Sequence, residues 1–457
     1  MMDFDAIIIG AGQAGPSLAG RLTTAGMKVA LIERKFIGGT CVNAGCMPTK
    51  TLVASARAAH VARNAAAFGV NVDQPVGIDM AKVKSRADTV IGNARGNLEA
   101  WLGKMADLTL VRGTARFDGP NAVAVGGKRL SAPRIFINVG GRPVIPRLPG
   151  IDEVAHLTST SILELDSVPR HLVIVGGSYI GLEFAQMYRR FGAEVTIVER
   201  NPRLISREDE DISDAIADIL GREGIGIRTG ADCIAFSRHS EGIAVSVDCT
   251  AGPPEIIGSH VLVAVGRRPN TDDLGLEAVG VETDERGYIK VNDRLETTAS
   301  GIWAMGDCNG WGGFTHTAYN DFEIVAANLL DNGDRKVSAR VAAYALYIDP
   351  PLGRAGMSER EARASGRPLL VSKRPMARVG RAVEKGETQG FMKAIADAET
   401  KQILGAAILG IEGDEAIHGI VDTMSSGSPY TVLQWAVPIH PTVSELIPTL
   451  LGDLKPA

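Results

Sequence analysis

The chain has 457 residues and a net charge of −5, and no basic tract interrupts it. Its 45 % hydrophobic and 22 % charged residues are typical of a globular protein and exclude disorder as the main state. The charge gives no electrostatic support for a nucleic-acid or anionic-membrane partner.

Length and targeting signals set further limits. A chain of this size predicts about three domains. The N-terminus lacks the basic region of a signal peptide, and no apolar run reaches membrane-spanning length. Five cysteines, an odd number in a long chain, do not form the pattern of a secreted disulfide framework. We therefore expect a cytoplasmic protein.

The first predicted unit opens the chain and is rich in glycine. A run of isoleucines leads into Gly10-x-Gly12-x-x-Gly15, then a helix-compatible stretch and a second apolar run that ends at Glu33. Strand, tight turn, helix, strand and acid form the βαβ unit that binds a dinucleotide. Small residues let the backbone approach a pyrophosphate, and the acid accepts from a ribose hydroxyl. A glycine-rich turn also occurs without a ligand.

The next segment carries Cys41 and Cys46, five residues apart. A regular helix places such residues about 8.7 Å apart, beyond the roughly 7 Å that a disulfide spans. A disulfide therefore needs an irregular backbone, which the neighbouring Gly45 and Pro48 favour. A helix N-terminus and Lys50, one turn after Cys46, would lower the thiol pKa. The alternatives are two core thiols or half a metal site, for which no second cysteine pair exists.

The dinucleotide pattern then recurs. Residues 173–200 repeat the apolar run, a turn Gly176-x-Ser178-x-x-Gly181, a helix-compatible stretch and a second run ending at Glu199. The acid follows the first motif glycine at the same distance as in the first unit. Because strand, turn, helix and acid agree twice, the sequence predicts two bound dinucleotides.

Three further stretches predict strands. IFINVGGRP, which ends at Pro143, and VLVAVGRRPN, which ends at Asn270, predict strands that end in glycine turns and return the chain between the two nucleotide domains. The run from Ile302 to Met305 ends in Gly306 and Asp307. The predicted domains are residues 1–150, residues 151–270, a return to the first domain over 271–334, and a last domain over 335–457.

Near the C-terminus lies His440-Pro441-Thr442-x-x-Glu445. Thiol–disulfide exchange needs a proton shuttle near pH 7, and histidine has a suitable pKa. By itself, a histidine before a proline is usually a surface turn residue, so this assignment depends on the other motifs.

Taken in order, the motifs GAGQAG, GGTCVNAGCMPTK, GGSYIGLE, GRRPN, WAMGD and HPTVSE resemble those of FAD-dependent pyridine nucleotide–disulfide oxidoreductases. That family includes glutathione reductase, dihydrolipoyl dehydrogenase and mercuric reductase, and the resemblance covers essentially the whole chain. It implies an α/β fold with two Rossmann-like domains, for FAD and NAD(P), and a C-terminal α+β dimerisation domain. It also implies a homodimer with shared active sites and no resident metal.

The resemblance implies one FAD per subunit, held by the first unit. Glu33 and the motif glycines would hold the ADP part, Ala115 would lie against adenine, and Asp307 would bond the ribityl chain. His316 would lie at a helix start under the flavin pyrimidine. The residues assigned to FAD are Gly10, Gly12, Gly15, Glu33, Arg34, Gly39, Thr40, Lys50, Ala115, Gly140, Asp307 and Thr315.

The resemblance also assigns the catalytic residues. Cys46 would be the thiolate that faces the flavin, and Cys41 the interchange thiol that attacks the acceptor. Lys50 would lie by flavin N5, paired with Glu183. His440, with Glu445, would reach the interchange cysteine of the partner subunit.

The second unit is assigned to NAD(P)H. Glu199 favours NADH, because a carboxylate accepts the 2′-hydroxyl and repels a 2′-phosphate; Arg200 and Arg203 are the alternative, since they could grip that phosphate. Tyr179 would cover the flavin until nicotinamide enters. The residues assigned to this nucleotide are Gly176, Ser178, Tyr179, Gly181, Glu199, Arg200 and Gly266.

The sequence thus predicts an NAD(P)H-dependent flavoprotein that reduces a small thiol-derived oxidant or disulfide through Cys41 and Cys46. The segment DPPLGRAGMSEREARASG resembles flavoproteins of the reactive-chlorine or hypothiocyanous-acid reductase type. Mercuric or other metal-ion reductase, dihydrolipoyl dehydrogenase, glutathione reductase and a low-turnover flavin redox sensor stay open. Cys308 is interpreted as a core residue, and Cys233 and Cys249 as plain strand residues.

Overall fold

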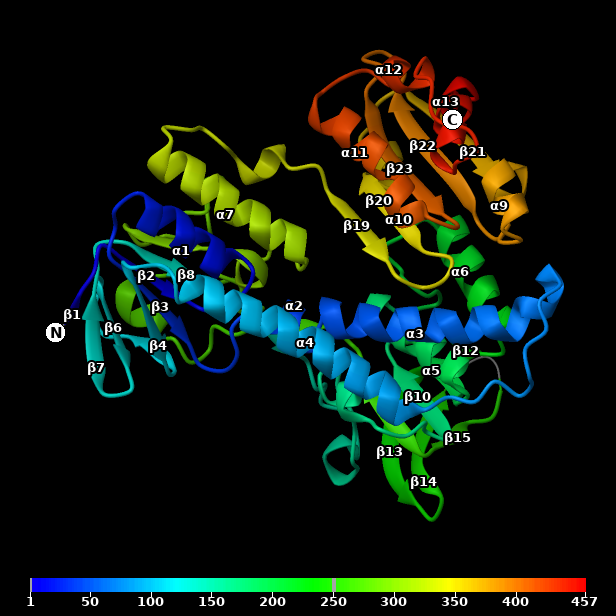
Figure 1. The fold of residues 1–457 in the computed structure, drawn as a ribbon, viewed down its shortest axis with the longest axis horizontal. Coiled ribbons are helices and arrows are strands. Elements are labelled where there is room, and N and C mark those ends of the chain that lie inside the picture. The colour runs from blue at the N-terminus through cyan, green and yellow to red at the C-terminus, as the bar shows by residue number, and fades with distance from the viewer. Residues whose placement is uncertain (1, 249–251) are drawn as a thin grey trace.

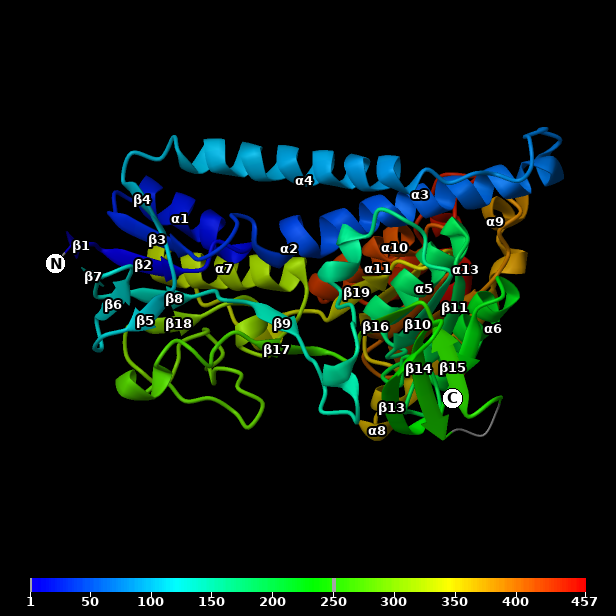
Figure 2. The same cartoon turned by 90° about the horizontal axis from the view of Figure 1, so that it is seen from below.

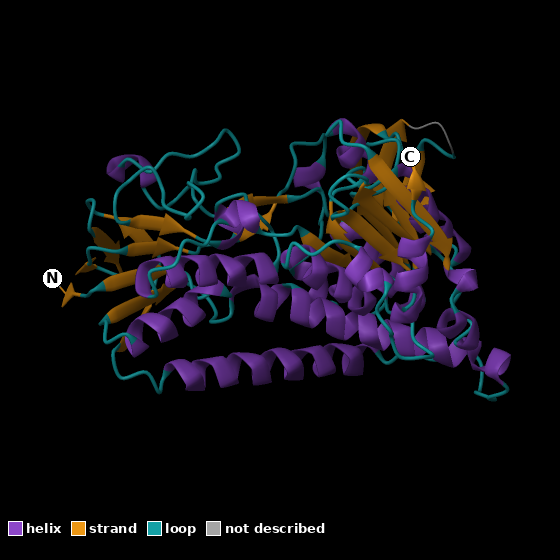
Figure 3. Ribbon diagram, turned by 90° about the horizontal axis from the view of Figure 1, so that it is seen from above, coloured by secondary structure: helices purple, strands orange, loops and turns teal. Residues whose placement is uncertain are grey.

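The computed structural model describes residues 2–248 and 252–457. Strands gather at the two ends of the molecule, and helices run along one side between them (Figure 3). The N-terminal sheets lie at one end, and the second nucleotide unit and the C-terminal sheet lie at the other (Figure 1). Among these residues, no helix combines the length and apolar character needed to cross a membrane.

The first unit folds into a five-stranded parallel sheet. Its three central strands are apolar and buried on both faces, as expected for parallel strands. In spatial order the strands are β18 (Ile302–Ala304), β8 (Ile135–Ile137), β2 (Ala6–Ile9), β3 (Val29–Glu33) and β4 (Leu108–Arg112).

The two faces of this sheet pack against different layers. Alternate residues such as Ile8 pack against helices α1 (Ala14–Thr24) and α7 (Thr315–Leu330). The intervening residues, such as Ile7, pack against a four-stranded sheet. In spatial order that sheet consists of β1 (Met2–Asp3), β7 (Lys128–Ser131), β6 (Ala122–Val125) and β5 (Ala115–Phe117).

The second unit repeats this plan. Its parallel sheet has the order β12 (Gly226–Arg228), β11 (Glu194–Val198), β10 (His171–Val175) and β16 (His260–Val263). Helices α5 (Tyr179–Phe191) and α6 (Glu210–Arg222) pack on one face. On the other face lies an antiparallel sheet of β13 (Asp232–His239), β14 (Gly242–Asp248) and β15 (Glu255–Gly258).

The return segments differ from the single strands that the sequence predicts. After β8 and after β16 the chain turns at Gly140 and Gly266, whose φ angles are 63° and 127°. It then continues as β9 (Gly141–Pro143) and β17 (Arg267–Pro269), which pair antiparallel. The glycines allow the turn, and the two short strands form a ribbon that connects the first and second units.

The C-terminal part forms a six-stranded antiparallel sheet. In spatial order it consists of β19 (Ala343–Leu346), β20 (Leu352–Gly356), β23 (Ile403–Leu409), β22 (Phe391–Asp397), β21 (Leu369–Pro375) and β24 (Lys455–Pro456). One face of this sheet joins the core of the second unit, and the other packs against short helices. The helices of this part are α8 (Glu359–Ala364), α9 (Gly380–Glu384), α10 (Gly413–Ala416), α11 (His418–Ser425), α12 (Thr431–Gln434) and α13 (Ile447–Gly452).

Two long helices span the molecule. Helix α3 (Cys46–Asn64) follows the short α2 (Gly39–Ala44), and α4 (Met80–Leu102) runs beside it (Figure 2). Leu52 and Ala56 of α3 belong to the core that the second unit and the C-terminal sheet share. The helix that begins at Cys46 is therefore anchored to all three parts of the chain.

A buried ionic network reinforces this anchoring. The guanidinium of Arg190, 5 % exposed, lies 2.7 Å from Glu223 and 2.5 Å from Asp349, and Arg57 of α3 lies 2.6 Å from Asp349. Burial tends to raise the pKa of Asp349, but the two guanidinium groups hold it below its usual value. The network thus joins α3 and α5 to the loop before β20.

Removal of Arg190 is expected to destabilise the fold strongly. Arg190→Met leaves Glu223 and Asp349 short of a counter-charge in a desolvated place, which typically costs about 3–5 kcal/mol. The midpoint of urea unfolding should fall accordingly. The matched control is Arg222→Met, because the Arg222–Asp218 pair is more than half exposed and is worth at most about 0.5 kcal/mol. Equal midpoints for the two variants would contradict a stabilising role for the network.

Candidate functional site

The two nucleotide units have the same hydrogen bonds around their acids. In the first unit the Glu33 carboxylate accepts from the backbone N–H of Ala11 at 2.9 Å and of Lys35 at 2.7 Å. In the second unit Glu199 accepts from the N–H of Gly177 at 2.6 Å and of Asn201 at 2.8 Å. Each acid is therefore fixed beside its glycine turn, where a ribose of a bound nucleotide would lie.

The glycines of both turns are required by close backbone contact. A Cβ atom on Gly15 would lie 2.3 Å from the carbonyl oxygen of Gly10, and one on Gly181 would lie 2.0 Å from that of Gly176. The helices that follow, α1 and α5, begin without a side-chain cap. No side chain therefore blocks the positive end of either helix, so both turns fit a dinucleotide.

The other predicted FAD residues surround the first turn. Gly10, Gly140 and Asp307 each follow a strand of the five-stranded parallel sheet, so they meet at the same edge of it. Burial raises the pKa of Asp307, which leaves a largely desolvated carboxyl there for a hydroxyl group to bond. A Cβ on Gly39 would lie 2.8 Å from the Cα of Gly12, which places the start of α2 against the turn.

Three predicted FAD residues lie elsewhere. Ala115 is buried in β5. Arg34 is at the surface, where it pairs with Asp273 at 2.8 Å. Thr40 is in α2, next to Cys41.

Two polar residues of this region were missed by sequence reasoning. Asn138 donates to the carbonyl of Gly10 at 3.1 Å. Asp321, 1 % exposed, accepts from the N–H of Gly306 at 2.8 Å and fixes the turn that carries Asp307. The sequence could have indicated Asp321, because it is an acidic residue on the apolar face of a helix. Nothing in the sequence around Asn138 indicates its role.

The redox segment has the backbone break that the sequence predicts. Helix α2 ends at Ala44, Gly45 adopts a non-helical conformation (φ −139°, ψ −115°), and α3 begins at Cys46. Cys41 is half-buried and Cys46 exposed, and both are free thiols that form a hydrogen bond with each other. The break brings two residues five apart in sequence within reach of one another.

The neighbours of Cys46 favour its thiolate. The hydrogen bond from Cys41, followed by that of Thr315 and the charge of Lys50, lowers the pKa of Cys46 to about 6 against an opposing effect of burial. The Thr315 hydroxyl lies 3.2 Å from the Cys46 sulfur. The hydrogen bond between the two cysteines raises the pKa of Cys41. At neutral pH the reduced pair therefore holds one thiolate, on Cys46.

Alkylation should report this pKa. In the reduced protein, iodoacetamide is expected to label Cys46 at a rate that falls as pH decreases through about 6, whereas an ordinary thiol titrates near about 8.5. Mass spectrometry of the labelled peptide measures the rate at each pH. Lys50→Met removes one of the groups that favour the thiolate, so its midpoint should move upward. A wild-type midpoint above pH 8 would contradict the assignment.

Lys50 and Glu183 meet as predicted. Their side chains form a 2.6 Å ion pair in which Glu183 is 6 % exposed. Glu183 also accepts from the backbone N–H of Tyr347 at 3.0 Å, and the Lys50 ammonium lies 4.7 Å from the Tyr347 ring centre. This pair thus connects α3 with α5 and with the C-terminal part. Lys50 itself lies one helical turn after Cys46.

Aromatic rings surround the predicted gate residue. Tyr179 is the first residue of α5 and packs edge-on against Phe314 and Tyr344. His316 is the second residue of α7, as predicted for a helix start, and stacks on Phe314. Burial lowers the pKa of His316, which keeps its imidazole neutral at pH 7.

His440 is held by Glu445 but lies at the surface. Its Nδ1 is 2.8 Å from the Glu445 carboxylate, and its side chain is 80 % exposed. Trp435, Val437 and Ile439, just before it, are 79 %, 96 % and 79 % exposed. Within the described chain, no hydrogen bond or ion pair joins His440 to either redox cysteine.

The other two described cysteines form no bond with Cys41 or Cys46. Cys308 is fully buried in the core beneath the five-stranded sheet, as interpreted from the sequence. Cys233 lies in β13 but is exposed and has a φ of 52°, at an irregularity in the pairing with β14, so it is not a plain strand residue. Cys249 lies outside the described residues. The described residues contain no group of three or more His, Cys, Asp or Glu that is placed to hold a metal ion.

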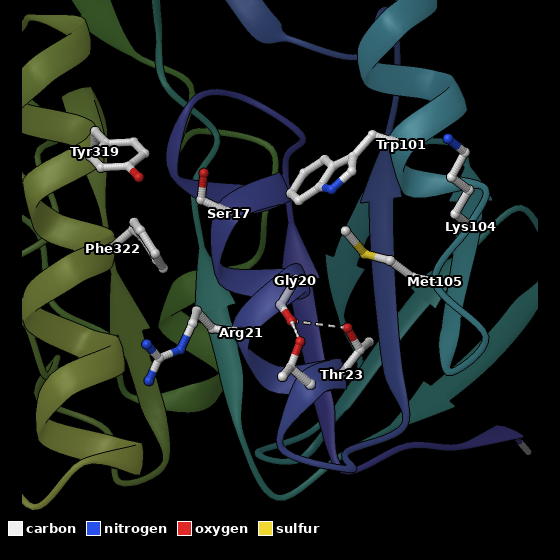
Figure 4. A pocket seen from close by; sticks show the side chains of 10 residues that line it. Ser17, Gly20, Arg21, Thr23, Trp101, Lys104, Met105, Tyr319 and Phe322 are labelled. Atoms are coloured by element: carbon white, nitrogen blue, oxygen red, sulfur yellow. Dashed lines mark hydrogen bonds between the residues drawn. The ribbon is translucent and has the colours of Figure 1, made fainter.

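A surface hollow of about 450 Å³ lies between α1, the end of α4 and α7 (Figure 4). It is lined in part by Arg21, Trp101 and Tyr319 and includes none of the predicted site residues. Arg21 is paired with Asp331 at 2.7 Å. The hollow lies on the flank of α1, away from its glycine turn, and we assign no cofactor to it.

Comparison with known proteins identifies relatives along the whole chain. The family model for pyridine nucleotide-disulphide oxidoreductases matches residues 4–321, and the dimerisation-domain model of the same family matches residues 342–451. The chain is 37 % identical to the probable pyridine nucleotide-disulfide oxidoreductase RclA of Escherichia coli, over 100 % of both chains. It is 34 % identical to the dihydrolipoyl dehydrogenase of Thermus scotoductus, over 97 % of this chain and 96 % of the relative.

Among solved structures, the fold is similar to the Cu(II) complex of the HOCl-induced flavoprotein disulfide reductase RclA from Escherichia coli. The TM-score is 0.89 at 36 % identity, and the match covers 99 % of each chain. These comparisons agree with the α/β architecture of two nucleotide domains and a C-terminal domain.

Proposed function

Because the chain belongs to the pyridine nucleotide-disulphide oxidoreductase family and is an FAD-dependent enzyme of that class, we propose that it reduces a small thiol-derived oxidant or disulfide with NAD(P)H through Cys41 and Cys46. Bound FAD supplies the two-electron chemistry that connects a nicotinamide to a disulfide. The observation that carries the proposal is the free cysteine pair, in which Cys46 has a pKa of about 6 one turn from the Lys50–Glu183 pair.

Different residues of this chain bind the nucleotides and carry out thiol–disulfide exchange. The turns at Gly10 and Gly176 hold the two nucleotides, and the ion pair of Lys50 and Glu183 fixes a positive charge beside the thiolate. In the dithiol state, Cys41 attacks one sulfur of an acceptor disulfide, forms a mixed disulfide and releases the first thiolate. Cys46 then attacks the Cys41 sulfur, restores the internal disulfide and releases the second thiolate.

The Cys41 thiol must lose its proton before it attacks, and the first released thiolate must gain one. We assign this proton transfer to His440 of the partner subunit in a homodimer, and the second released thiolate takes its proton from solvent. The exposed histidine held by Glu445, the exposed apolar residues before it and the match to the dimerisation domain support this arrangement. In that position the imidazole acts as a general acid toward the leaving thiolate.

For the nucleotide, we propose NADH. The Glu199 carboxylate is fixed at the end of β11, where it accepts a ribose 2′-hydroxyl and repels a 2′-phosphate. Arg203, the alternative phosphate ligand, is paired with Glu210 at 2.8 Å and Asp214 at 3.2 Å. Arg200 is the exposed cation that stays available to a phosphate.

Anaerobic reduction followed by an acceptor panel tests the proposal. The purified flavoprotein is expected to be reduced faster by NADH than by NADPH, and then to be reoxidised by one of lipoamide, glutathione disulfide or hypothiocyanite. A cytoplasmic setting fits such a role, because a neighbouring cysteine pair in a reducing compartment is more often catalytic than structural. Reduction without reoxidation by any sulfur acceptor would contradict the proposal and favour a redox sensor.

Metal-ion reduction is a second candidate, favoured by the Cu(II) complex of the similar Escherichia coli protein. Two Cu(II) ions would each take one electron from the Cys41–Cys46 dithiol and leave as Cu(I), while the thiol protons pass to solvent and the disulfide is restored. Adding Cu(II) and mercuric ion to the panel distinguishes the two functions. Fast reoxidation by a metal ion and slow reoxidation by every sulfur acceptor would favour the metal-ion reductase.

A further inference from the structure

A buried polar chain runs from Tyr179 into the C-terminal part of the molecule. The Tyr344 ring lies edge-on to Tyr179, with centroids 5.4 Å apart, and stacks on Phe314 at 5.7 Å. The Tyr344 hydroxyl donates a hydrogen bond to the carboxylate of Glu208. Tyr344 belongs to β19, whereas Glu208 lies between β11 and α6 of the second unit.

The end of this chain is an incompletely satisfied charge pair. The side chains of Glu208 and Arg354 are 0 % and 2 % exposed, and Arg354 Nε lies 3.6 Å from Glu208 Oε2. Among the described residues, neither Glu208 Oε2 nor Arg354 Nη2 has a hydrogen-bond partner. A buried pair with unmade hydrogen bonds is a poor source of stability. Its placement behind Tyr344 points instead to a role in positioning.

The segment that carries Glu208 is fixed at both ends. The N–H of Ile205 donates to the carbonyl of Gly177 in the nucleotide turn at 2.8 Å, and Ile205 has a φ of 40°. At the other end, Asp209 accepts from the N–H of Glu359 in α8 at 2.9 Å. The segment therefore connects the turn of the second unit directly to the C-terminal part.

We propose that Glu208 and Arg354 are positioning residues for nicotinamide binding, which act through Tyr344 to hold Tyr179 in its closed position. The inference rests on the proposed NAD(P)H reductase function, because Tyr179 matters only where a nicotinamide must displace it. Tyr179 is fixed by its ring contacts and by the bond from Tyr344 to Glu208. A bound nucleotide must disrupt this arrangement, so the anchor lowers the apparent affinity.

Tyr344→Phe is the sharpest test, because it keeps the ring that stacks on Phe314 and removes only the hydroxyl. The probe is NAD⁺, titrated into the oxidised holoenzyme by calorimetry. The dissociation constant is expected to fall about tenfold, which lies within the range for loss of a hydrogen bond to a charged group. Glu208→Gln is expected to shift it in the same direction, with an added loss of stability because Arg354 loses its counter-charge.

Two further variants separate positioning from general loosening. Tyr188→Phe removes the hydroxyl of a different buried tyrosine, which lies in α5 and donates to the carbonyl of Ile162 at 3.1 Å. This change should leave the dissociation constant for NAD⁺ unchanged. In a Tyr179→Ala background, adding Tyr344→Phe should change the constant less than about twofold, because the residue being positioned is absent.

Each outcome bears on one proposal or on both. An unchanged constant in Tyr344→Phe, or an equal shift with and without Tyr179, overturns the inference and leaves the reductase function intact. A wild-type holoenzyme whose flavin neither NADH nor NADPH reduces overturns the proposed function, and the inference with it. A tenfold shift that disappears in the Tyr179→Ala background supports the inference.

Discussion

Cys41→Ser is expected to abolish acceptor turnover while flavin reduction by NADH continues. The substitution removes the proposed attacking sulfur, and loss of a covalent nucleophile lowers kcat by about 10⁴-fold or more in other enzymes. The nucleotide turns at Gly10 and Gly176 do not contain Cys41, so hydride donation has no reason to slow. Stopped-flow absorbance measures flavin reduction, and steady-state NADH consumption with the identified acceptor measures turnover.

The spectrum of the same variant supplies a second readout. Cys41→Ser keeps Cys46 and its bond to Thr315 at 3.2 Å, and the introduced hydroxyl can still donate to the Cys46 sulfur. Under the proposed roles, the flavin absorbance should therefore show a neighbouring thiolate although no disulfide can form. The matched control is Cys233→Ser, a change at an exposed cysteine of β13 in the second unit, which should leave turnover in place. Undiminished turnover in Cys41→Ser would remove Cys41 from the interchange role.

His440→Ala is expected to slow the acceptor half-reaction by about 10²–10⁴-fold, the usual contribution of a general acid or base. Flavin reduction should change little, because that half-reaction does not use the proposed proton donor. Single-turnover measurements of reduction and of reoxidation separate the two effects.

A partial variant and an assembly measurement complete this test. Glu445→Gln keeps a hydrogen-bond acceptor for His440 Nδ1 but removes the negative charge, so reoxidation should slow less than in His440→Ala. Sedimentation should give a dimer for both variants and for the wild type. Equal slowing of reduction and reoxidation, or a monomeric His440→Ala, would contradict a role in proton transfer.

Local sequence patterns were sufficient to predict much of the structure of this molecule. The two βαβ units and the broken helix between Cys41 and Cys46 follow from residues close together in sequence. Strand and helix periodicity, glycine turns and a cysteine spacing that a helix cannot bridge are local properties, and local properties can be read from one chain. The resemblance of the motifs added the family, which the comparisons confirm.

Other features depended on contacts between distant segments. Nothing near Glu208, Arg354 or Tyr344 in the sequence indicates that they meet. Their contact arises because the segment after β11 docks on the C-terminal sheet. The pairing of β9 with β17 likewise required the two glycine turns to face each other.

The sequence by itself determined which residues are capable of the chemistry: two glycine turns with their acids, a cysteine pair with Lys50, and a histidine with Glu445. The tertiary structure determined the pKa values and the charge pairing of those residues. The pKa of Cys46, which Cys41 lowers most, is lowered further by Thr315, 269 residues away, and the Lys50–Glu183 pair needs α3 packed on α5. A thiol pKa and a buried charge pair depend on distance and burial, and both are set only when the chain is folded.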